Sequence, residues 1–112
     1  MTRRILINPN RVNAENRVYS QSVTTDMKYE VDFSNAASDL GTSVSSATAE
    51  SKGRHSMTLT TPTVSSNVVN FFATSDTSGD GVIKVTATYA TGKQEAQFIK
   101  LQITNPANKR YY

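Results

Sequence analysis

The chain has no cysteine and no tryptophan, and its 112 residues include one histidine and three prolines. Without cysteine it forms no disulfide bond, carries no thiolate nucleophile and builds no cysteine-based zinc site. No apolar run approaches the ~20 residues of a membrane-spanning helix, so no membrane partner is expected. The apolar run near the N-terminus is too short for a signal peptide, which predicts a protein made in the cytosol.

The net charge of +3 is unevenly distributed along the chain. Residues 1–17 carry +3, residues 18–108 carry −2, and Lys109 with Arg110 add +2. Basic ends can bind nucleic acid or an acidic face of a partner protein. Because the predicted strand faces between them are net acidic, a protein is the expected partner and nucleic acid is not.

The last third of the chain shows the clearest pattern of secondary structure. Apolar residues alternate with polar ones in residues 83–89 and again in residues 99–103, on either side of Thr91-Gly92-Lys93. A period of two is typical of half-buried strands, and a short polar turn containing glycine joins such strands into a hairpin. Residues 27–33 alternate in the same way, with Lys28, Glu30 and Asp32 on a predicted solvated face.

Other segments complete an all-β pattern. We expect strands in residues 17–23, 42–50 and 57–60, a short loop or helical turn around Ala36-Ala37, and a strand in residues 68–73 that is buried on both faces. About seven short strands with turn signals every ~8–12 residues predict an immunoglobulin-like β-sandwich. The expected organisation is an extended basic arm (1–17), the sandwich (18–104) and an exposed tail (105–112).

Few residues are candidates for metal binding or catalysis. Residues 76–83 begin like an EF-hand calcium loop, but the twelfth position, which needs a bidentate glutamate, is Ala87. Asp76 to Gly81 is therefore predicted to be a plain β-turn, with calcium as the alternative. His55 is expected to be exposed, and Glu30 with Asp32 to be surface charges rather than a glycosidase pair. No catalytic residue, cofactor or metal is predicted, and the chain is expected not to be an enzyme.

Partner contacts are expected at the two ends of the chain. The apolar segment Ile5-Leu6-Ile7, flanked by arginines, is expected to fold back as an edge strand, to add to the sheet of a neighbouring subunit, or to be disordered. Phe98 has the parity of an outward-facing residue, and the final tyrosines can dock on a neighbour. The candidate contact residues are Arg3, Arg4, Ile5, Leu6, Ile7, Arg11, Phe98, Lys109, Arg110, Tyr111 and Tyr112.

Four segments in order carry a family resemblance. Residues 29–34 (Tyr-Glu-Val-Asp-Phe-Ser), residues 40–48 and the closing segments 86–95 and 99–103 resemble the fiber–tail adaptor family of tailed bacteriophages. The likeness spans residues 26–104. The chain departs from the family pattern in lacking a tryptophan near Ala49 and in having a longer N-terminal arm.

The resemblance implies a small immunoglobulin-like virion protein. Such a protein would join tail or neck components to fibers, in several copies of a symmetric assembly. A capsid decoration or head-fiber protein is the alternative, and a carbohydrate-binding module, which needs an exposed aromatic platform, is a third class. If the arm makes the contacts, deletion of residues 1–17 is expected to abolish incorporation into particles and to leave the domain folded.

Overall fold

The computed structural model describes residues 2–7 and 18–105. In that part of the chain, nine strands and one short helix follow one another. Their bounds are β1 (Thr2–Leu6), β2 (Val18–Ser22), β3 (Met27–Asp32), α1 (Ser34–Asp39), β4 (Val44–Lys52), β5 (Thr58–Leu59), β6 (Thr63–Ser65), β7 (Val68–Thr74), β8 (Gly79–Tyr89) and β9 (Gln94–Thr104). The short helix is the only one among the described residues, so no described helix is long or apolar enough to cross a membrane.

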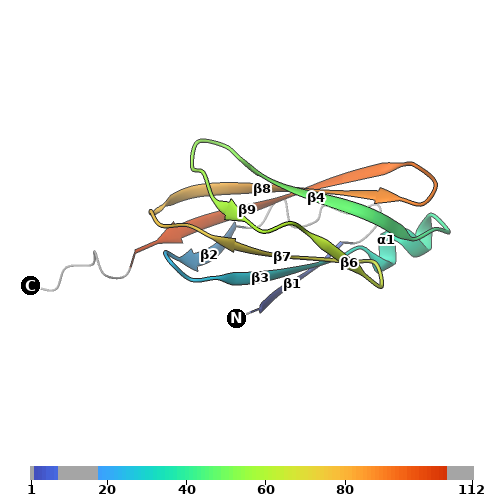
Figure 1. The fold of residues 1–112 in the computed structure, drawn as a ribbon, viewed down its shortest axis with the longest axis horizontal. Coiled ribbons are helices and arrows are strands. Elements are labelled where there is room, and N and C mark those ends of the chain that lie inside the picture. The colour runs from blue at the N-terminus through green and yellow to red at the C-terminus, as the bar shows by residue number, and fades with distance from the viewer. Residues whose placement is uncertain (1, 8–17, 106–112) are drawn as a thin grey trace, which may run out of the picture.

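The strands form two stacked sheets, which confirms the predicted all-β sandwich (Figure 1). Sheet A has the order β1-β3-β7-β5, and β6 also pairs with β7. Sheet B has the order β2-β9-β8-β4. Two pairings are parallel, β1 with β3 and β2 with β9, and the others are antiparallel.

The β8–β9 hairpin has the predicted turn. Ile83 lies opposite Ile99, and the inward residues of both strands are buried. Gly92 closes the turn with a φ of 94°, a left-handed conformation that favours glycine. Its amide donates to the carbonyl of Tyr89, and the amide of Tyr89 donates to the carbonyl of Lys93, each at 2.8 Å.

The core lies between the sheets and is built from alternate residues of the long strands. Tyr29 from β3 stacks on Phe71 from β7 with ring centroids 5.5 Å apart. Burial of each such side chain stabilises the fold by roughly 1.5–3 kcal/mol. The largest fully buried side chains are Tyr29, Tyr89, Phe33, Phe71, Ile7, Ile83, Ile99, Leu101, Val31, Val69 and Val85.

The N-terminal segment corrects the predicted free arm. Thr2–Leu6 pairs with β3 in the same chain, from Thr2 opposite Lys28 to Leu6 opposite Asp32. Ile5 and Ile7 are buried in the core, whereas Leu6 is 49% exposed. Of the three arrangements considered for this segment, the structure has the folded-back edge strand. Removing residues 1–17 would therefore remove part of the core, contrary to the expectation that the domain stays folded.

Two further expectations about burial are wrong. The run 68–73 was expected to be buried on both faces, but Phe72 is 39% exposed while its neighbour Phe71 is buried. Asp32, expected on a solvated face, is buried at the end of β3. The structure also places Ala36 and Ala37 in α1, where both are buried. The structure therefore differs from the sequence-based expectations mainly in which residues of sheet A are exposed to solvent.

Candidate functional site

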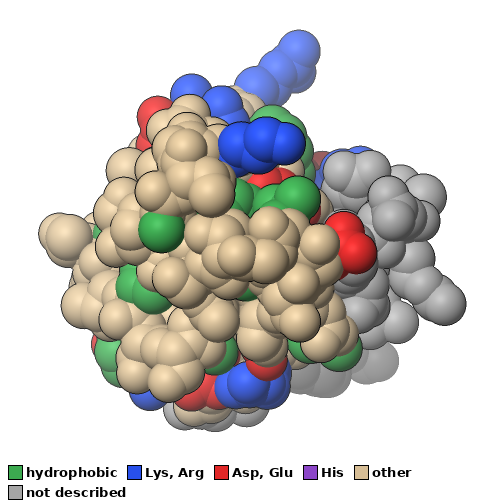
Figure 2. Space-filling model, turned by 90° about the vertical axis from the view of Figure 1, so that its right-hand side faces the viewer, with side chains coloured by type: hydrophobic (Ala, Val, Ile, Leu, Met, Phe, Trp, Pro, Cys, Tyr) green, Lys and Arg blue, Asp and Glu red, His purple; other side chains and the backbone are tan. Residues whose placement is uncertain are grey.

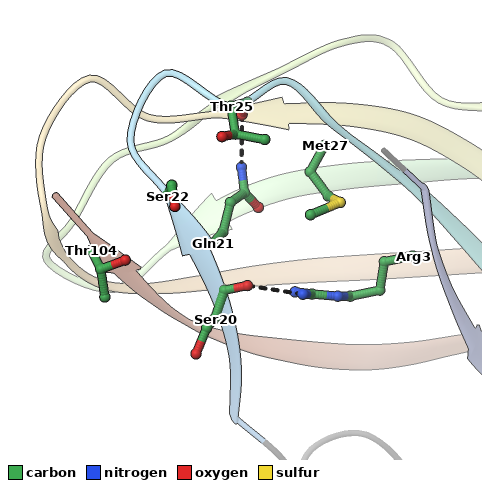
Figure 3. A pocket seen from close by; sticks show the side chains of 7 residues that line it. All are labelled: Arg3, Ser20, Gln21, Ser22, Thr25, Met27 and Thr104. Atoms are coloured by element: carbon green, nitrogen blue, oxygen red, sulfur yellow. Dashed lines mark hydrogen bonds between the residues drawn. The ribbon is translucent and has the colours of Figure 1, made fainter. Parts of the chain in front are cut away.

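Arg3 connects the two sheets at one edge of the sandwich (Figure 3). It extends from β1 in sheet A to β2 in sheet B, where its Nη2 donates to the carbonyl of Ser20 at 2.8 Å. The guanidinium carbon lies 4.9 Å from the ring centroid of Tyr19 and 5.8 Å from that of Tyr29. At these distances the cation is attracted to both ring faces. Arg3 is thus engaged within the chain, although it was predicted to contact a partner.

A small pocket of about 140 Å³ opens beside Arg3, and the buried polar residue that lines it forms hydrogen bonds within the fold. Gln21 is almost fully buried there and donates from Nε2 to the carbonyls of Thr25 and Ala73, at 3.1 and 2.9 Å. Its Oε1 accepts from the hydroxyl of Tyr29 at 2.7 Å. Burial raises the pKa of Tyr29 to about 12, with Arg3 opposing the shift, so the phenol remains a donor at neutral pH. The amide hydrogens of Gln21 are therefore bound by main-chain carbonyls, and its oxygen is bound by the phenol of Tyr29.

Arg4 forms an ion pair with each of two carboxylates on the outer face of sheet A. Its guanidinium lies 3.1 Å from Glu30 and 2.6 Å from Asp32. Asp32 also accepts hydrogen bonds from the amide and the hydroxyl of Ser34, the first residue of α1. Burial alone would raise the pKa of Asp32, but the hydrogen bonds from Ser34 and the ion pair with Arg4 lower it overall. This pairing fixes β1 to the start of the helix.

We expect Asp32 to make the fold acid-labile. The pKa of Asp32 is lower in the folded state than in the unfolded state. Its contribution to the free energy of unfolding is therefore complete above its unfolded-state pKa of about 3.9. That contribution is lost as the pH falls through its folded-state pKa. Asp32→Asn should cost about 1–3 kcal/mol at pH 7 and flatten the loss of stability below pH ~4. Urea unfolding at a series of pH values measures both effects. Asp39→Asn, at an exposed position, is the control, and equal pH profiles for the two variants would contradict the assignment.

The outer face of sheet B carries an exposed apolar group, which we call the sheet B patch (Val18, Val82, Lys84, Phe98 and Lys100). Val18 is 60% exposed and Phe98 37% exposed. Across the strands, Lys100 lies opposite both Val18 and Val82, and Lys84 lies opposite Phe98. A largely apolar hollow of about 270 Å³ opens among these strands.

The two lysines of the patch are positioned to meet a negative partner. Among the ion pairs between described side chains, none involves Lys84 or Lys100. At the end of the molecule shown in Figure 2, tan atoms, which are backbone and other uncharged groups, prevail, and charged and hydrophobic side chains are scattered among them. A cluster of exposed apolar side chains on such a surface is typical of a contact region.

The predicted contact residues fall into three groups. Phe98 is exposed in the sheet B patch, and Leu6 is exposed on sheet A. Ile5 and Ile7 lie in the core, and Arg3 and Arg4 bind groups of their own chain, although the Arg4 side chain is 54% exposed. The remaining candidates lie outside the described residues: Arg11, Lys109, Arg110, Tyr111 and Tyr112.

His55 is not the exposed residue that was predicted. It is half-buried, and its Nε2 lies 2.7 Å from the hydroxyl of Ser75, which is itself buried. The ring packs on Gly79, where an added Cβ would lie 2.8 Å from Nδ1. This contact holds the β4–β5 connection against the start of β8 and explains the glycine by close packing.

The Asp76–Gly81 segment forms a turn that leads into β8. Asp76 and Asp80 are exposed, and Gly79 to Gly81 already belong to the strand. Across residues 2–7 and 18–105, no three or more histidine, cysteine, aspartate or glutamate side chains gather as metal ligands would. The segment's glycines are accounted for by packing, since a Cβ at Gly81 would lie 2.9 Å from the sulfur of Met57.

Comparison with known proteins defines the class of fold. The chain matches no known family profile and no curated protein sequence. Among solved structures it is similar to the PKD domain from the KIAA 1837 protein, with a TM-score of 0.57, 14% identity, and coverage of 88% of this chain and 90% of that one. It is also similar to the cysteine protease inhibitor EhICP2 from Entamoeba histolytica, with a TM-score of 0.54, 11% identity, and coverage of 92% and 97%. The chain is therefore an immunoglobulin-like β-sandwich, and at these identities the likeness concerns the fold alone.

Sequence reasoning found only one residue of the sheet B patch. Alternation predicted that Phe98 faces outward, but Val18, Lys84 and Lys100 were not singled out. Their grouping depends on the registers of β2 and β8 with β9, which bring residues more than 80 positions apart together. The parallel β2–β9 pairing has no local turn to reveal it, so the position of Val18 beside Lys100 could not be predicted from the sequence.

Proposed function

We propose that this protein is a non-enzymatic structural component of a tailed-bacteriophage particle, where it joins tail or neck proteins to fiber proteins. The observation that carries the proposal is the sheet B patch, a group of apolar side chains and two lysines on the outer face of sheet B. The resemblance of residues 26–104 to fiber–tail adaptors supports a location at the tail or neck of the particle. The structural neighbours support the fold of such a module and say nothing of its partners.

The chemistry of the patch defines the surface that would bind it. A protein interface combines a desolvated apolar centre with a polar rim, and aromatic residues provide much of the binding energy. Phe98, Val18 and Val82 would supply the apolar contacts. Lys100, which lies between Val18 and Val82, and Lys84, opposite Phe98, would supply the ammonium groups. The complementary surface on the neighbouring subunit would present a small apolar group beside carboxylates. Docking through a strand face would leave the core unchanged.

Particle incorporation tests the proposal. Phe98→Ala should reduce the number of copies per purified particle by about tenfold or more, because truncating an interface aromatic typically costs more than ~1.4 kcal/mol. Quantitative mass spectrometry of particles made with each variant provides the count. Phe72→Ala is a matched control, since Phe72 has a similar exposure but lies on sheet A.

The location of the protein in the particle is a second readout. Cryo-EM of particles carrying a labelled chain should place it at the tail or neck. A position over the capsid shell would favour the decoration role instead. Absence of the chain from purified particles, or equal incorporation of the Phe98→Ala and wild-type proteins, would refute the proposed docking.

A further inference from the structure

The outer face of sheet A contains a hollow that the docking surface does not use. Its volume is about 590 Å³, within the range of small-molecule binding sites. Its floor and walls come from β3, from β7 and from the segment that links β5 and β6. The lining residues are Lys28, Glu30, Thr60, Thr61, Thr63, Ser65, Asn70, Phe71 and Phe72.

Phe72 presents an aromatic ring at this hollow. Its side chain is 39% exposed because β7 directs Phe71 into the core and Phe72 outward. The main-chain amide of Phe72 donates to the hydroxyl oxygen of Thr60 at 2.9 Å. That bond holds the β5–β6 connection against β7 and leaves the Thr60 hydroxyl hydrogen for another acceptor. The hollow thus has an aromatic ring beside a fixed polar wall.

The polar groups of the hollow are mixed in type and balanced in charge. Lys28 and Glu30 are its only charged lining residues, and their charged atoms lie 3.6 Å apart. Asn70 lies opposite Glu30 on one side and Thr63 on the other, so a carboxylate, an amide and a hydroxyl form one row across the sheet. Together these side chains supply hydrogen-bond donors and acceptors without a net charge.

We propose that this hollow binds a neutral saccharide. A sugar ring has an apolar C–H face and a rim of hydroxyl groups that both donate and accept. The C–H face would lie on the ring of Phe72, whose face is electron-rich. The hydroxyl groups would bond with the side chains of Glu30, Asn70 and Thr63 around it.

Other ligand classes fit the lining less well. An anion such as a phosphate requires an excess of basic or amide donors, and a cation an excess of carboxylates, whereas this hollow contains one of each charge. A purely apolar ligand would leave the hydroxyl groups and the amide without partners. This inference does not depend on the proposed particle role, because it concerns the opposite face of the sandwich.

Titration of the ¹⁵N-labelled full chain with neutral sugars tests the proposal. The probes are glucose, galactose, N-acetylglucosamine, maltose and cellobiose. Two-dimensional NMR measures the chemical shifts of the protein during each titration. At least one sugar should produce saturable shifts at Lys28, Asn70 and Phe72, with a Kd on the order of 1 mM for so open a site. Phe72→Ala should weaken that binding about tenfold or more, whereas Phe98→Ala should leave it unchanged.

A second variant separates binding from folding. Thr63→Val removes a hydroxyl at nearly constant volume and should weaken binding while the spectrum remains that of the folded protein. The proposal is overturned if none of the five sugars gives saturable shifts, or if Phe72→Ala binds as well as the wild type. Saturation by inorganic phosphate or by an acidic peptide, with no response to sugars, would also overturn it.

Discussion

Replacing both Ile5 and Ile7 with alanine is expected to bring the domain close to complete unfolding. Both side chains are buried in the core although they belong to the N-terminal segment. Truncation of a buried isoleucine typically costs about 2–5 kcal/mol, and a domain of this size has a total stability of about 5–15 kcal/mol. The pair of changes should therefore remove most of the free energy of unfolding. Urea denaturation followed by circular dichroism measures the loss.

Leu6 provides an internal control for this prediction. It lies between the two isoleucines on β1 but is 49% exposed, so Leu6→Ala should change the stability by at most about 0.5–1 kcal/mol. The contrast distinguishes a core strand from a free arm. If the double variant were no less stable than Leu6→Ala, β1 would not contribute to the core and the arm interpretation would return.

Replacing Gln21 with leucine is expected to cost about 3 kcal/mol, the second largest effect. The buried amide serves three partners, because it donates to the carbonyls of Thr25 and Ala73 and accepts from the hydroxyl of Tyr29. Leucine has a similar volume but leaves these groups unsatisfied, and each buried unsatisfied group costs roughly 1–3 kcal/mol. Thermal and chemical unfolding should both register the change.

A double-mutant cycle isolates the contact between the amide and the phenol. Tyr29→Phe alone removes one hydroxyl, and in the Gln21→Leu background that loss should be much smaller, since the partner is already gone. Gln102→Leu is the control for the first change, because Gln102 is exposed on β9 of the same sheet. Additive effects of Gln21→Leu and Tyr29→Phe would show that the two side chains do not act together.

Local patterns predicted the parts of the fold that local interactions determine. The β8–β9 hairpin was evident because its alternation and the Thr91–Lys93 turn are contiguous in sequence. The alternation of Met27, Tyr29 and Val31 likewise identified β3, and all three side chains are buried. Each assignment depends on a period of two, which a strand must keep if one face is to enter a core.

The features that sequence reasoning missed depend on distant pairings. The edge strand formed by Ile5 and Ile7 was one of the expected arrangements, but its partner was not identified, because β3 begins some twenty residues later and no turn joins the two. Phe72 was assigned to a buried strand because both its neighbours and its own side chain are apolar. Its exposure follows from the position of β7 in sheet A, where the outer face meets solvent. The candidate sites lie on these outer faces, so composition alone did not locate them.

The pairing of β1 with β3 also constrains the order of events during synthesis. During synthesis, Thr2–Leu6 cannot pair until Met27–Asp32 has also left the ribosome. In that interval Ile5 and Ile7 are exposed to water and prone to stick to other nascent chains. Arg3 and Arg4 stand directly before them, as charged gatekeepers do beside aggregation-prone segments. In the folded chain the same two arginines anchor the segment, Arg3 to Ser20 and Arg4 to Asp32.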